Sequence, residues 1–241
     1  KVLHRVAGRR MAEHVVRAAL ETGADPVAVV TGAQAEEVEQ TLRAAFPGER
    51  LVFAPQPERL GTADAVLRAR QALRRFDGDV LILCGDVPAL GAKALGSLLS
   101  HHRRQQAALT VLTAELVDPG GYGRIVRDSR SSIAEIVEHR DASKAQREIR
   151  EINTGTYCAD WKALLDALDR VRPDNDQGEY YLTDAVRLLL EAGRKVSARI
   201  HPDAAEALGV NSRRQLAHVH GIMNRRLVEQ LMDAGVTVLD P

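Results

Sequence analysis

The most apolar run of the chain ends in an acidic residue. Residues 81–88 read LILCGDVP, and we expect residues 80–84 to form a buried strand that Pro88 ends. Gly85 would let a ligand approach the backbone, and Asp86 would hold Mg²⁺ against substrate phosphates, because Mg²⁺ prefers oxygen ligands. The pattern leaves a second interpretation open, in which Asp86 caps the next helix or lies in a turn.

Two further segments place polar residues where a helix is predicted to begin. Residues 56–63 (QPERLGTA) follow a predicted strand and contain Gln56, Gly61 and Thr62. The amides of a helix start can bind an anion or the edge of a base, with Thr62 as the candidate N-cap, but most Gly-Thr pairs there are simple caps. Asn211 precedes a long predicted helix, where an asparagine is ordinarily just the cap.

The charge composition argues against two classes of binding partner, nucleic acids and membranes. The 241 residues include 33 Lys+Arg and 33 Asp+Glu, so the net charge gives no bulk attraction to nucleic acid or to an anionic membrane. The pairs Arg103–Arg104 and Arg213–Arg214 are better interpreted as solvated helix faces than as binding patches. We therefore expect neither a nucleic-acid partner nor a membrane partner.

Cysteine usage and hydropathy indicate the compartment. Cys84 and Cys158 have no metal-site spacing and are too few for a disulfide framework, so we expect buried free thiols. The chain has no apolar run of about 18 residues and no hydrophobic signal region at its start. These features predict a cytoplasmic protein.

Helical and strand patterns alternate in the first half of the chain. The predicted helices cover about residues 11–20, 35–46 and 62–75, and the predicted strands cover 27–30, 51–53 and 80–84. Continuous apolar strands between amphipathic helices are what a parallel sheet covered on both faces requires. The order predicts a doubly wound, mostly parallel α/β sheet, with ligands beyond the carboxyl ends of its strands.

The middle of the chain changes character. Residues 109–116 are predicted to form another strand. Shorter β-rich pieces over residues 124–127, 133–138 and 152–157, joined by Gly-rich turns, predict a small antiparallel β extension. Helices near residues 161–168, 183–192 and 212–234 and a strand at 195–200 complete the pattern. The length fits one large α/β domain, or a nucleotide-binding domain with a smaller insert.

Eight ordered motifs resemble a known family. They are KVLH (1–4), Gln56 with LGTA (60–63), GDVP (85–88), GGYGRI (120–125), IVEHRDA (136–142), EINTG (151–155), QGEYYLTD (177–184) and GVN (209–211). Over nearly its whole length the chain resembles the N-acetylglucosamine-1-phosphate uridylyltransferase domain of the bacterial bifunctional uridylyltransferase/glucosamine-1-phosphate acetyltransferase. That family has the Rossmann-like fold of nucleotide-diphospho-sugar transferases.

The resemblance implies a reaction and a cofactor. The sugar-1-phosphate oxygen would attack the α-phosphorus of UTP, giving UDP-N-acetylglucosamine for peptidoglycan and cell-envelope synthesis, and pyrophosphate. Mg²⁺ is the implied cofactor, with Asp86 and Asn211 as its ligands, and Lys1 matches a phosphate-contacting lysine. Lys1 and Asp86 are thus the implied catalytic residues, and catalysis would rest on positioning and charge neutralisation without a protein nucleophile.

The resemblance also assigns the substrate contacts. Gln56, Gly61 and Thr62 would recognise the uracil and hold the nucleotide, beside Gly85 and Asn211. The implied contacts to the sugar phosphate are Gly123, Glu138, Asn153, Tyr181 and Thr183. The uridylyltransferase domain, residues 1–241, would comprise a nucleotide-binding part of about 1–116, a sugar-binding part of about 117–211 and a C-terminal helix of about 212–234.

Three features depart from the family pattern. The family opens with a strand and a Gly-rich phosphate loop before the lysine matched by Lys1, so we expect residues upstream of it in the native molecule. The family continues past a position like Asp240 into an acetyltransferase β-helix and forms a homotrimer, but no hexapeptide repeat occurs here, so we expect no acetyl transfer. Cys84 stands where the family usually has an aromatic residue.

Two other functions remain open from the sequence. One is a related sugar-1-phosphate nucleotidyltransferase that uses another sugar or dTTP, which a comparison of UTP with dTTP turnover would separate. The other is a non-catalytic sugar-nucleotide sensor. The presence of both Asp86 and Asn211 argues against the sensor, because a pure binder has less need of a metal pair.

Overall fold

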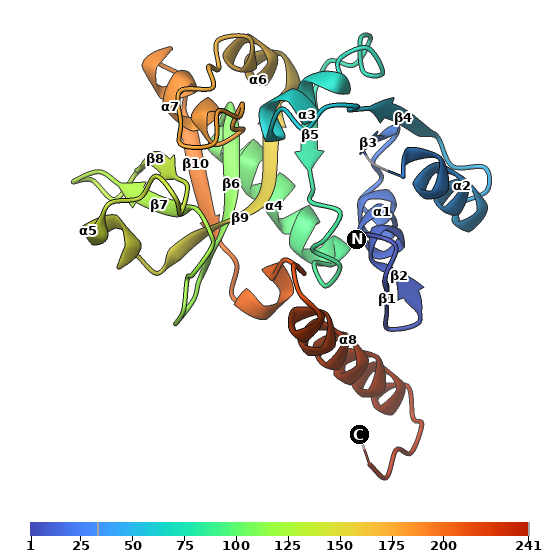
Figure 1. Ribbon diagram of the computed structural model, residues 1–241. Coiled ribbons are helices and arrows are strands. Elements are labelled where there is room, and N and C mark those ends of the chain that lie inside the picture. The colour runs from blue at the N-terminus through green and yellow to red at the C-terminus, as the bar shows by residue number, and fades with distance from the viewer. Residues whose placement is uncertain (33, 241) are drawn as a thin grey trace.

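The computed structural model describes residues 1–32 and 34–240, so residues 33 and 241 of the predicted domain lie outside the description (Figure 1). The N-terminal elements are β1 (Arg5–Val6), β2 (Arg9–Arg10), α1 (Met11–Glu21), β3 (Val27–Thr31), α2 (Ala35–Ala45), β4 (Leu51–Pro55) and α3 (Thr62–Arg68). Strands β3 and β4 pair in parallel. Val16 of α1 packs with Val38 and Leu42 of α2 and with Leu51 of β4, because the apolar residues of each helix recur on one face.

A six-stranded sheet forms the centre of the molecule. Its strands are β5 (Asp79–Ile82), β6 (Leu109–Glu115), β7 (Arg124–Arg127), β8 (Ile133–Val137), β9 (Glu151–Asp160) and β10 (Val196–Ile200). Strand β9 lies between β5 and β6 and is antiparallel to both, while β10 pairs with β6 in parallel. Strands β5, β6 and β10 therefore run in one direction, which agrees with the predicted α/β sheet.

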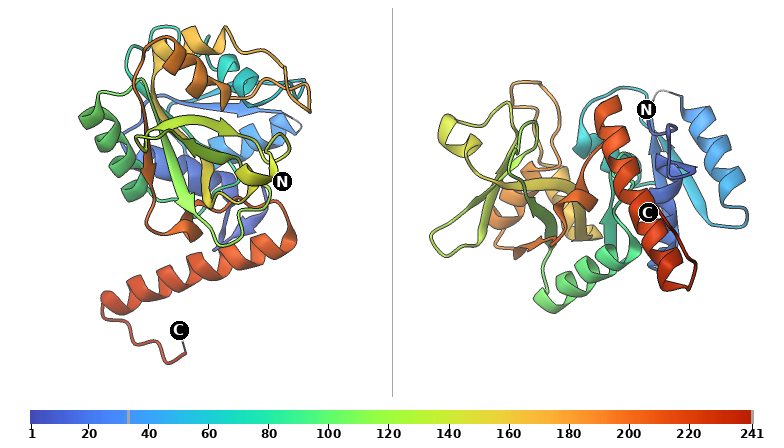
Figure 2. Two further views of the ribbon diagram at one scale, coloured as in Figure 1. Left: turned by 90° about the vertical axis from the view of Figure 1, so that its left-hand side faces the viewer. Right: turned by 90° about the horizontal axis from the view of Figure 1, so that it is seen from below.

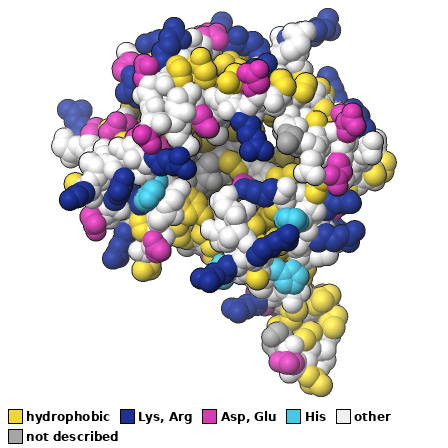
Figure 3. All heavy atoms as spheres, viewed as in Figure 1, with side chains coloured by type: hydrophobic (Ala, Val, Ile, Leu, Met, Phe, Trp, Pro, Cys, Tyr) yellow, Lys and Arg dark blue, Asp and Glu magenta, His cyan; other side chains and the backbone are white. Residues whose placement is uncertain are grey.

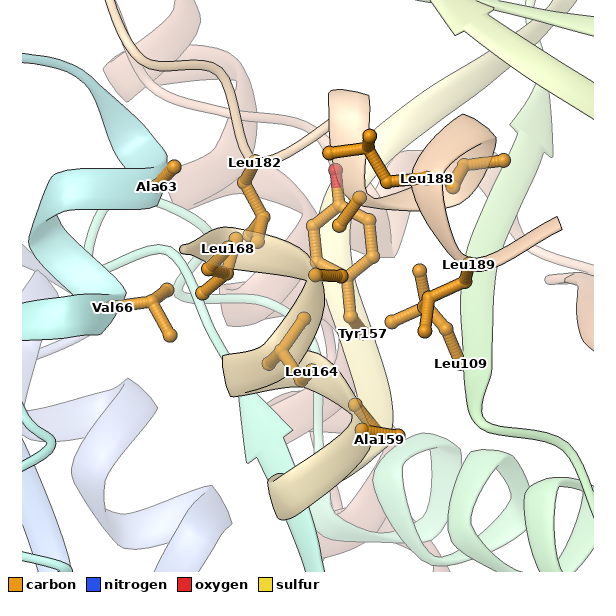
Figure 4. Packing of buried hydrophobic residues seen from close by; sticks show 14 of the residues in the cluster. Ala63, Val66, Leu109, Tyr157, Ala159, Leu164, Leu168, Leu182, Leu188 and Leu189 are labelled. Atoms are coloured by element: carbon orange, nitrogen blue, oxygen red, sulfur yellow. The ribbon is translucent and has the colours of Figure 1, made fainter. Parts of the chain in front are cut away.

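Helices cover both faces of this sheet, because side chains alternate along each strand. These helices are α4 (Ala92–Gln105), α6 (Trp161–Leu168) and α7 (Asp184–Glu191). Leu109 and Val111 of β6 pack with α6 and α7, whereas Leu112 packs with Leu95 of α4. Figure 4 shows the first of these clusters, in which leucines of α6 and α7 surround the ring of Tyr157 from β9. The predicted doubly wound arrangement is confirmed.

The predicted antiparallel extension is present in part, as β7 and β8, whereas the piece predicted at residues 152–157 belongs to β9 in the centre of the main sheet. Strand β7 pairs with β8, and Arg124 at the start of β7 pairs with Ile152 of β9. The short helix α5 (Lys144–Arg147) lies beside this hairpin, at the left of Figure 1. The extension thus continues from the first half of β9, away from the part of β9 that pairs with β5.

Helix α8 (Arg213–Asp233) follows the short 3₁₀ helix η1 (Ala204–Ala207). The hydroxyl of Ser212 caps α8 by accepting the N–H of Gln215 at 3.2 Å. The first turns of α8 pack Val219 against Val6, and the rest of the helix extends away from the sheet (Figures 1 and 2). No helix of the described residues is long and apolar enough to cross a membrane.

Two expected elements differ from the structure. Helix α3 ends at Arg68 rather than near residue 75. Residues 69–75 form turns instead, and Leu73 and Phe76 reach the core without a helix. Strand β5 is only half-buried, and within the described residues it has one hydrogen-bonded neighbour, β9. Strand β3 is similarly paired only with β4 there, so the strands form separate sheets rather than one.

Candidate active site

Three segments that are distant in sequence meet in the turn after β5. The ammonium group of Lys1 lies 2.5 Å from Oδ2 of Asp86 and 2.7 Å from Oδ1 of Asn211. The Lys1 side chain is 46% exposed and the Asp86 side chain is 23% exposed, so a solvated ligand can reach both. The structure therefore brings together the three residues that were predicted to bind metal and phosphate.

Hydrogen bonds from the backbone hold this arrangement. The N–H of Val210 donates to the carbonyl oxygen of Asp86 at 2.9 Å, which joins the turn after β5 to the segment before α8. The N–H of Gly209 donates to the hydroxyl oxygen of Tyr122 at 3.3 Å, which ties in the loop before β7. Sequence reasoning did not select Tyr122, and its place in the Gly-rich loop is the one signal that could have found it.

The capping interpretations of Asp86 and Asn211 are both wrong. Helix α4 begins after Gly91, so Asp86 does not cap it, and Asp86 lies in a turn after the strand end at residue 82, which the second interpretation also included. Helix α8 is capped by Ser212, so Asn211 precedes the cap. Its side-chain oxygen is consequently directed to the ammonium group of Lys1 rather than to a helix amide.

The two oxygens that flank the Lys1 ammonium group suit a divalent cation. A carboxylate and an amide oxygen already converge on one positive centre, at 2.5 and 2.7 Å. Mg²⁺ is bound in this way by one or two protein oxygens together with substrate phosphates and water. Among the described residues, no group of three or more His, Cys, Asp or Glu side chains could hold a metal ion by itself. The residues present therefore fit Mg²⁺ that is shared with a phosphate substrate.

A second cluster surrounds Gly123 at the start of β7. A Cβ atom on Gly123 would lie 3.3 Å from Oε2 of Glu138 and 3.6 Å from Cβ of Asn153, so glycine lets the backbone approach both. The N–H of Asn153 donates to the Gly123 carbonyl at 2.9 Å, and the Thr183 hydroxyl donates to Oε1 of Glu138 at 3.3 Å. Burial raises the pKa of Glu138, and the hydrogen bond from Thr183 opposes that shift. Four predicted site residues thus meet here.

Asn153 is held in place by a β-bulge in β9. The register with β6 shifts at this point, so that Thr154 and Gly155 have no partner residue on β6. Gly155 has φ +76°, and a Cβ atom there would lie 2.7 Å from the sulfur of Cys84. Oδ1 of Asn153 accepts the N–H of Gly155 at 3.0 Å, and its Nδ2 donates to the hydroxyl of Tyr157 at 2.7 Å. Both ends of this side chain are therefore fixed.

Cys84 and Gly85 border the turn that carries Asp86. The thiol of Cys84 donates to the Gly155 carbonyl at 3.4 Å, and burial raises its pKa to about 12. Both cysteines are free, as predicted, although Cys84 is half-buried. A Cβ atom on Gly85 would lie 3.4 Å from a methyl carbon of Val2, which is close to an ordinary van der Waals contact.

Gln56 and Gly61 form a third cluster between β4 and α3. The side-chain amide of Gln56 donates to the carbonyl of Gly61 at 3.0 Å and to Oδ2 of Asp64 at 2.8 Å. A carbonyl and a carboxylate can only accept, so the amide orientation is fixed and Oε1 is the atom left for a ligand. Asp64 was missed by sequence reasoning, although it lies in the first turn of the predicted helix.

The prediction that Thr62 caps α3 is wrong. Gly61 occupies the N-cap position with φ +116°, and Thr62 is the first helical residue. The Thr62 hydroxyl accepts the N–H of Leu182 at 2.9 Å. A Cβ atom on Gly61 would lie 2.7 Å from the backbone nitrogen of Tyr180 and closer still to its carbonyl oxygen, so this position requires glycine.

The segment from Tyr180 to Thr183 joins the second and third clusters. Main-chain hydrogen bonds of 2.8 and 2.9 Å connect Tyr180 to residues 60–63, and Thr183 reaches the second cluster. Tyr181 is buried, and its hydroxyl accepts from the side chain of Gln177 at 2.7 Å. Within the described residues, no side-chain hydrogen bond joins Tyr181 to the other predicted site residues.

The face seen in Figure 1 is hollowed near its middle, between the β7–β8 extension and the segment after β5 (Figure 3). Basic and acidic side chains are interspersed over this face. A separate cavity of about 530 Å³ is lined in part by Ala108 and Lys195, at the amino-terminal ends of β6 and β10. That cavity lies at the edge of the sheet opposite to Asp86 and contains none of the predicted site residues.

The sequence matches the nucleotidyl transferase family over residues 1–206. It is 48% identical to the bifunctional protein GlmU of Pelotomaculum thermopropionicum and 49% identical to that of Anaeromyxobacter dehalogenans, over 241 residues in each case. These alignments cover 100% of this chain but 52% and 49% of the two relatives. The chain therefore spans about half the length of the curated relatives that it matches.

A solved structure shares the fold. The crystal structure of a UDP-glucose pyrophosphorylase complexed with UDP-glucose superimposes with a TM-score of 0.75, over 94% of this chain and 90% of that one. The sequence identity is 15%, so this likeness concerns the fold alone. It confirms the predicted Rossmann-like nucleotidyltransferase fold.

Proposed function

The chain belongs to the nucleotidyl transferase family, and we propose that it joins UTP to N-acetylglucosamine-1-phosphate, forming UDP-N-acetylglucosamine and pyrophosphate. The choice of UTP and of this amino sugar is supported by relatives that are 46–49% identical over the whole chain. The product would feed peptidoglycan and other cell-envelope precursors. No acetyl transfer is assigned to these residues.

One observation carries this proposal. Lys1, Asp86 and Asn211 come from distant parts of the chain, yet their polar atoms converge on a single point after β5. A cation, a carboxylate and an amide oxygen in contact are suited to managing the charge of a phosphoryl group during transfer. A protein that only bound a sugar nucleotide would have less need of this arrangement, which supports transfer over sensing.

In the proposed reaction, an oxygen of the sugar-1-phosphate attacks the α-phosphorus of UTP. A bond forms between them, and the bond from the α-phosphorus to the oxygen that bridges to the β-phosphate breaks. Pyrophosphate leaves with that electron pair. The ammonium group of Lys1 would lie beside the phosphoryl oxygens and stabilise their negative charge, so no side chain has to form a covalent intermediate.

We assign Asp86 and Asn211 as the residues that hold Mg²⁺. The support is their oxygen donor pair and the positive group that it already contacts. When bound, Mg²⁺ neutralises charge on phosphate oxygens. The hydrogen bond from Val210 to the Asp86 backbone keeps both ligands on the same side of the site.

The other two clusters are assigned to the two substrates. Glu138 offers acceptor oxygens and Asn153 offers one remaining amide hydrogen, which complement the hydroxyl and acetamide groups of the sugar. Oε1 of Gln56 is an acceptor that complements the N–H of uracil. This assignment agrees with a nucleotide-binding part of about 1–116 and a sugar-binding part of about 117–211.

The direct test is product formation by the full-length natural protein. With Mg²⁺, UTP and N-acetylglucosamine-1-phosphate, we expect UDP-N-acetylglucosamine and pyrophosphate in equal amounts, separated by ion-exchange chromatography. Parallel reactions replace UTP by dTTP, or the amino sugar by glucose-1-phosphate. Absence of product, or faster turnover with either replacement, would reject the proposed substrates.

A further inference from the structure

Tyr157 combines a buried ring with a polar tip at the sugar cluster. Its side chain is on β9 and is 2% exposed. The ring packs among Leu164 and Leu168 of α6 and Leu188 and Leu189 of α7 (Figure 4). Packing of this density fixes the ring, and therefore fixes the position of the hydroxyl oxygen at its end.

The hydroxyl of Tyr157 contacts a side chain that a regular strand would keep distant. Residues four apart along a β-strand are separated by about 13 Å, at roughly 3.3 Å per residue. The bulge at Thr154 and Gly155 shortens this path, and Nδ2 of Asn153 lies 2.7 Å from the Tyr157 oxygen. The bulge and the fixed ring together thus place the Tyr157 hydroxyl oxygen where it accepts a hydrogen bond from Asn153.

This contact determines what Asn153 can offer to a ligand. One of its two amide hydrogens is donated to Tyr157, and its oxygen accepts the N–H of Gly155 at 3.0 Å. One amide hydrogen remains, in a fixed direction. Burial raises the pKa of Tyr157, with the nearby Glu138 carboxylate adding to the shift, so its hydroxyl stays neutral.

We propose that Tyr157 is a positioning residue for the sugar phosphate, and that its hydroxyl holds the amide of Asn153 in the orientation that binds this substrate. The proposal rests on the function proposed above. It adds a residue that lies outside the sugar-binding motif and that does not itself have to touch the substrate.

The test uses Tyr157→Phe in the full-length natural protein, because this change removes one oxygen and keeps the ring. Thr110→Val is the matched control. It removes another buried hydroxyl from the same sheet, one that lies 2.9 Å from a ring nitrogen of His102 on the side of the sheet that α4 covers. KM and kcat are measured for both substrates, and thermal denaturation verifies that each variant is folded.

We expect Tyr157→Phe to raise KM for N-acetylglucosamine-1-phosphate by roughly 5- to 30-fold, the range for losing one well-placed hydrogen bond. KM for UTP should stay within about twofold, and the Thr110 variant should resemble the parent protein. An unchanged KM for the sugar phosphate would overturn the proposal. So would equal rises for both substrates, or an equal effect of Thr110→Val, because these results indicate general loosening of the sheet.

A double-mutant cycle separates positioning from stability. In an Asn153→Ala background, Tyr157→Phe should change KM for the sugar phosphate by less than about twofold, since the side chain that it positions is gone. Full additivity of the two substitutions would overturn the proposal.

Nuclear magnetic resonance of the Asn153 side-chain amide gives a readout that does not depend on activity. In Tyr157→Phe, both amide proton resonances should shift relative to the parent protein. If the parent protein does not use UTP and N-acetylglucosamine-1-phosphate, the proposed function fails, and this measurement still decides whether Tyr157 holds the amide of Asn153. Unmoved resonances would overturn it.

Discussion

Replacing Asp86 by asparagine removes one negative charge and keeps the shape of the side chain. In the structure this charge lies 2.5 Å from the Lys1 ammonium group, and the Asp86 side chain is 23% exposed. Unit charges about 4 Å apart interact by roughly 4 kcal/mol at an effective dielectric constant of about 20. Loss of one charge-stabilising group in an active site costs roughly 10²- to 10³-fold in rate. We therefore expect both Asp86→Asn and Asp86→Ala to lower kcat by at least about 10²-fold.

The assay follows pyrophosphate release by the full-length natural protein at saturating substrates, over a titration with Mg²⁺. Asp169→Asn is the matched control, since Asp169 also pairs with a basic side chain, that of Arg70 at 2.6 Å, but is 56% exposed. Exposed pairs contribute about 0–1 kcal/mol, so this variant should keep near-parental turnover. Near-normal, Mg²⁺-dependent turnover in the Asp86 variants would refute the assignment. An equal loss in the Asp169 control would refute it as well.

Three other substitutions test the remaining clusters. Asn153→Ala should raise KM for N-acetylglucosamine-1-phosphate by roughly 5- to 100-fold, because an unpaired buried polar group costs about 1–3 kcal/mol. KM for UTP should stay unchanged, and an effect confined to UTP would contradict this. Gly61→Ala should lower both Tm and the affinity for UTP, since a Cβ atom would meet the Tyr180 backbone and φ is +116°, so an unchanged Tm would exclude this reasoning. Burial raises the pKa of Glu138 in the folded state above its ordinary value of 4.5, so the unfolded chain releases this proton at a lower pH than the folded protein. The free energy of unfolding therefore falls as pH rises from 4.5 through the folded pKa. Glu138→Gln should remove that fall and raise Tm near pH 7, and identical pH profiles of Tm in the two proteins would disprove it.

The sequence was sufficient to predict a helix where the helix has its own N-cap residue and a clear buried face. The predicted helix at residues 161–168 has the observed bounds of α6, because Asp160 caps it by accepting the N–H of Ala163 at 2.7 Å. Leu164 and Leu168 are spaced to bury the same face of that helix. The motif order also predicted which residues come together after β5, since Lys1, Asp86 and Asn211 do meet, and their roles stay predictions.

Other features depend on contacts that no local pattern contains. The bulge in β9 arises from pairing with β6, a strand about 40 residues earlier, and the sequence EINTG does not reveal it. The bounds of helix α4 were not predicted, although Ala94, Leu95 and Leu98 have helical spacing and bury one face. Cap statistics rank threonine and glycine about equally at the start of α3, and only the close contact with Tyr180 requires glycine there.

Residues 177–184 (QGEYYLTD) form one continuous motif that contacts two clusters, the one around Gln56 and the one around Gly123. Residues 180–183 lead into a turn at Leu182 and Thr183, and successive residues contact different partners. Tyr180 uses its main chain to hold residues 60–63, and Leu182 donates its N–H to Thr62 at 2.9 Å. Thr183 instead directs its hydroxyl to Glu138. Residues 60–63 contact mainly the backbone of this segment, whereas Glu138 contacts the Thr183 side chain. Thr183→Val would therefore disturb the cluster around Gly123 alone, whereas a change of backbone path would disturb both clusters.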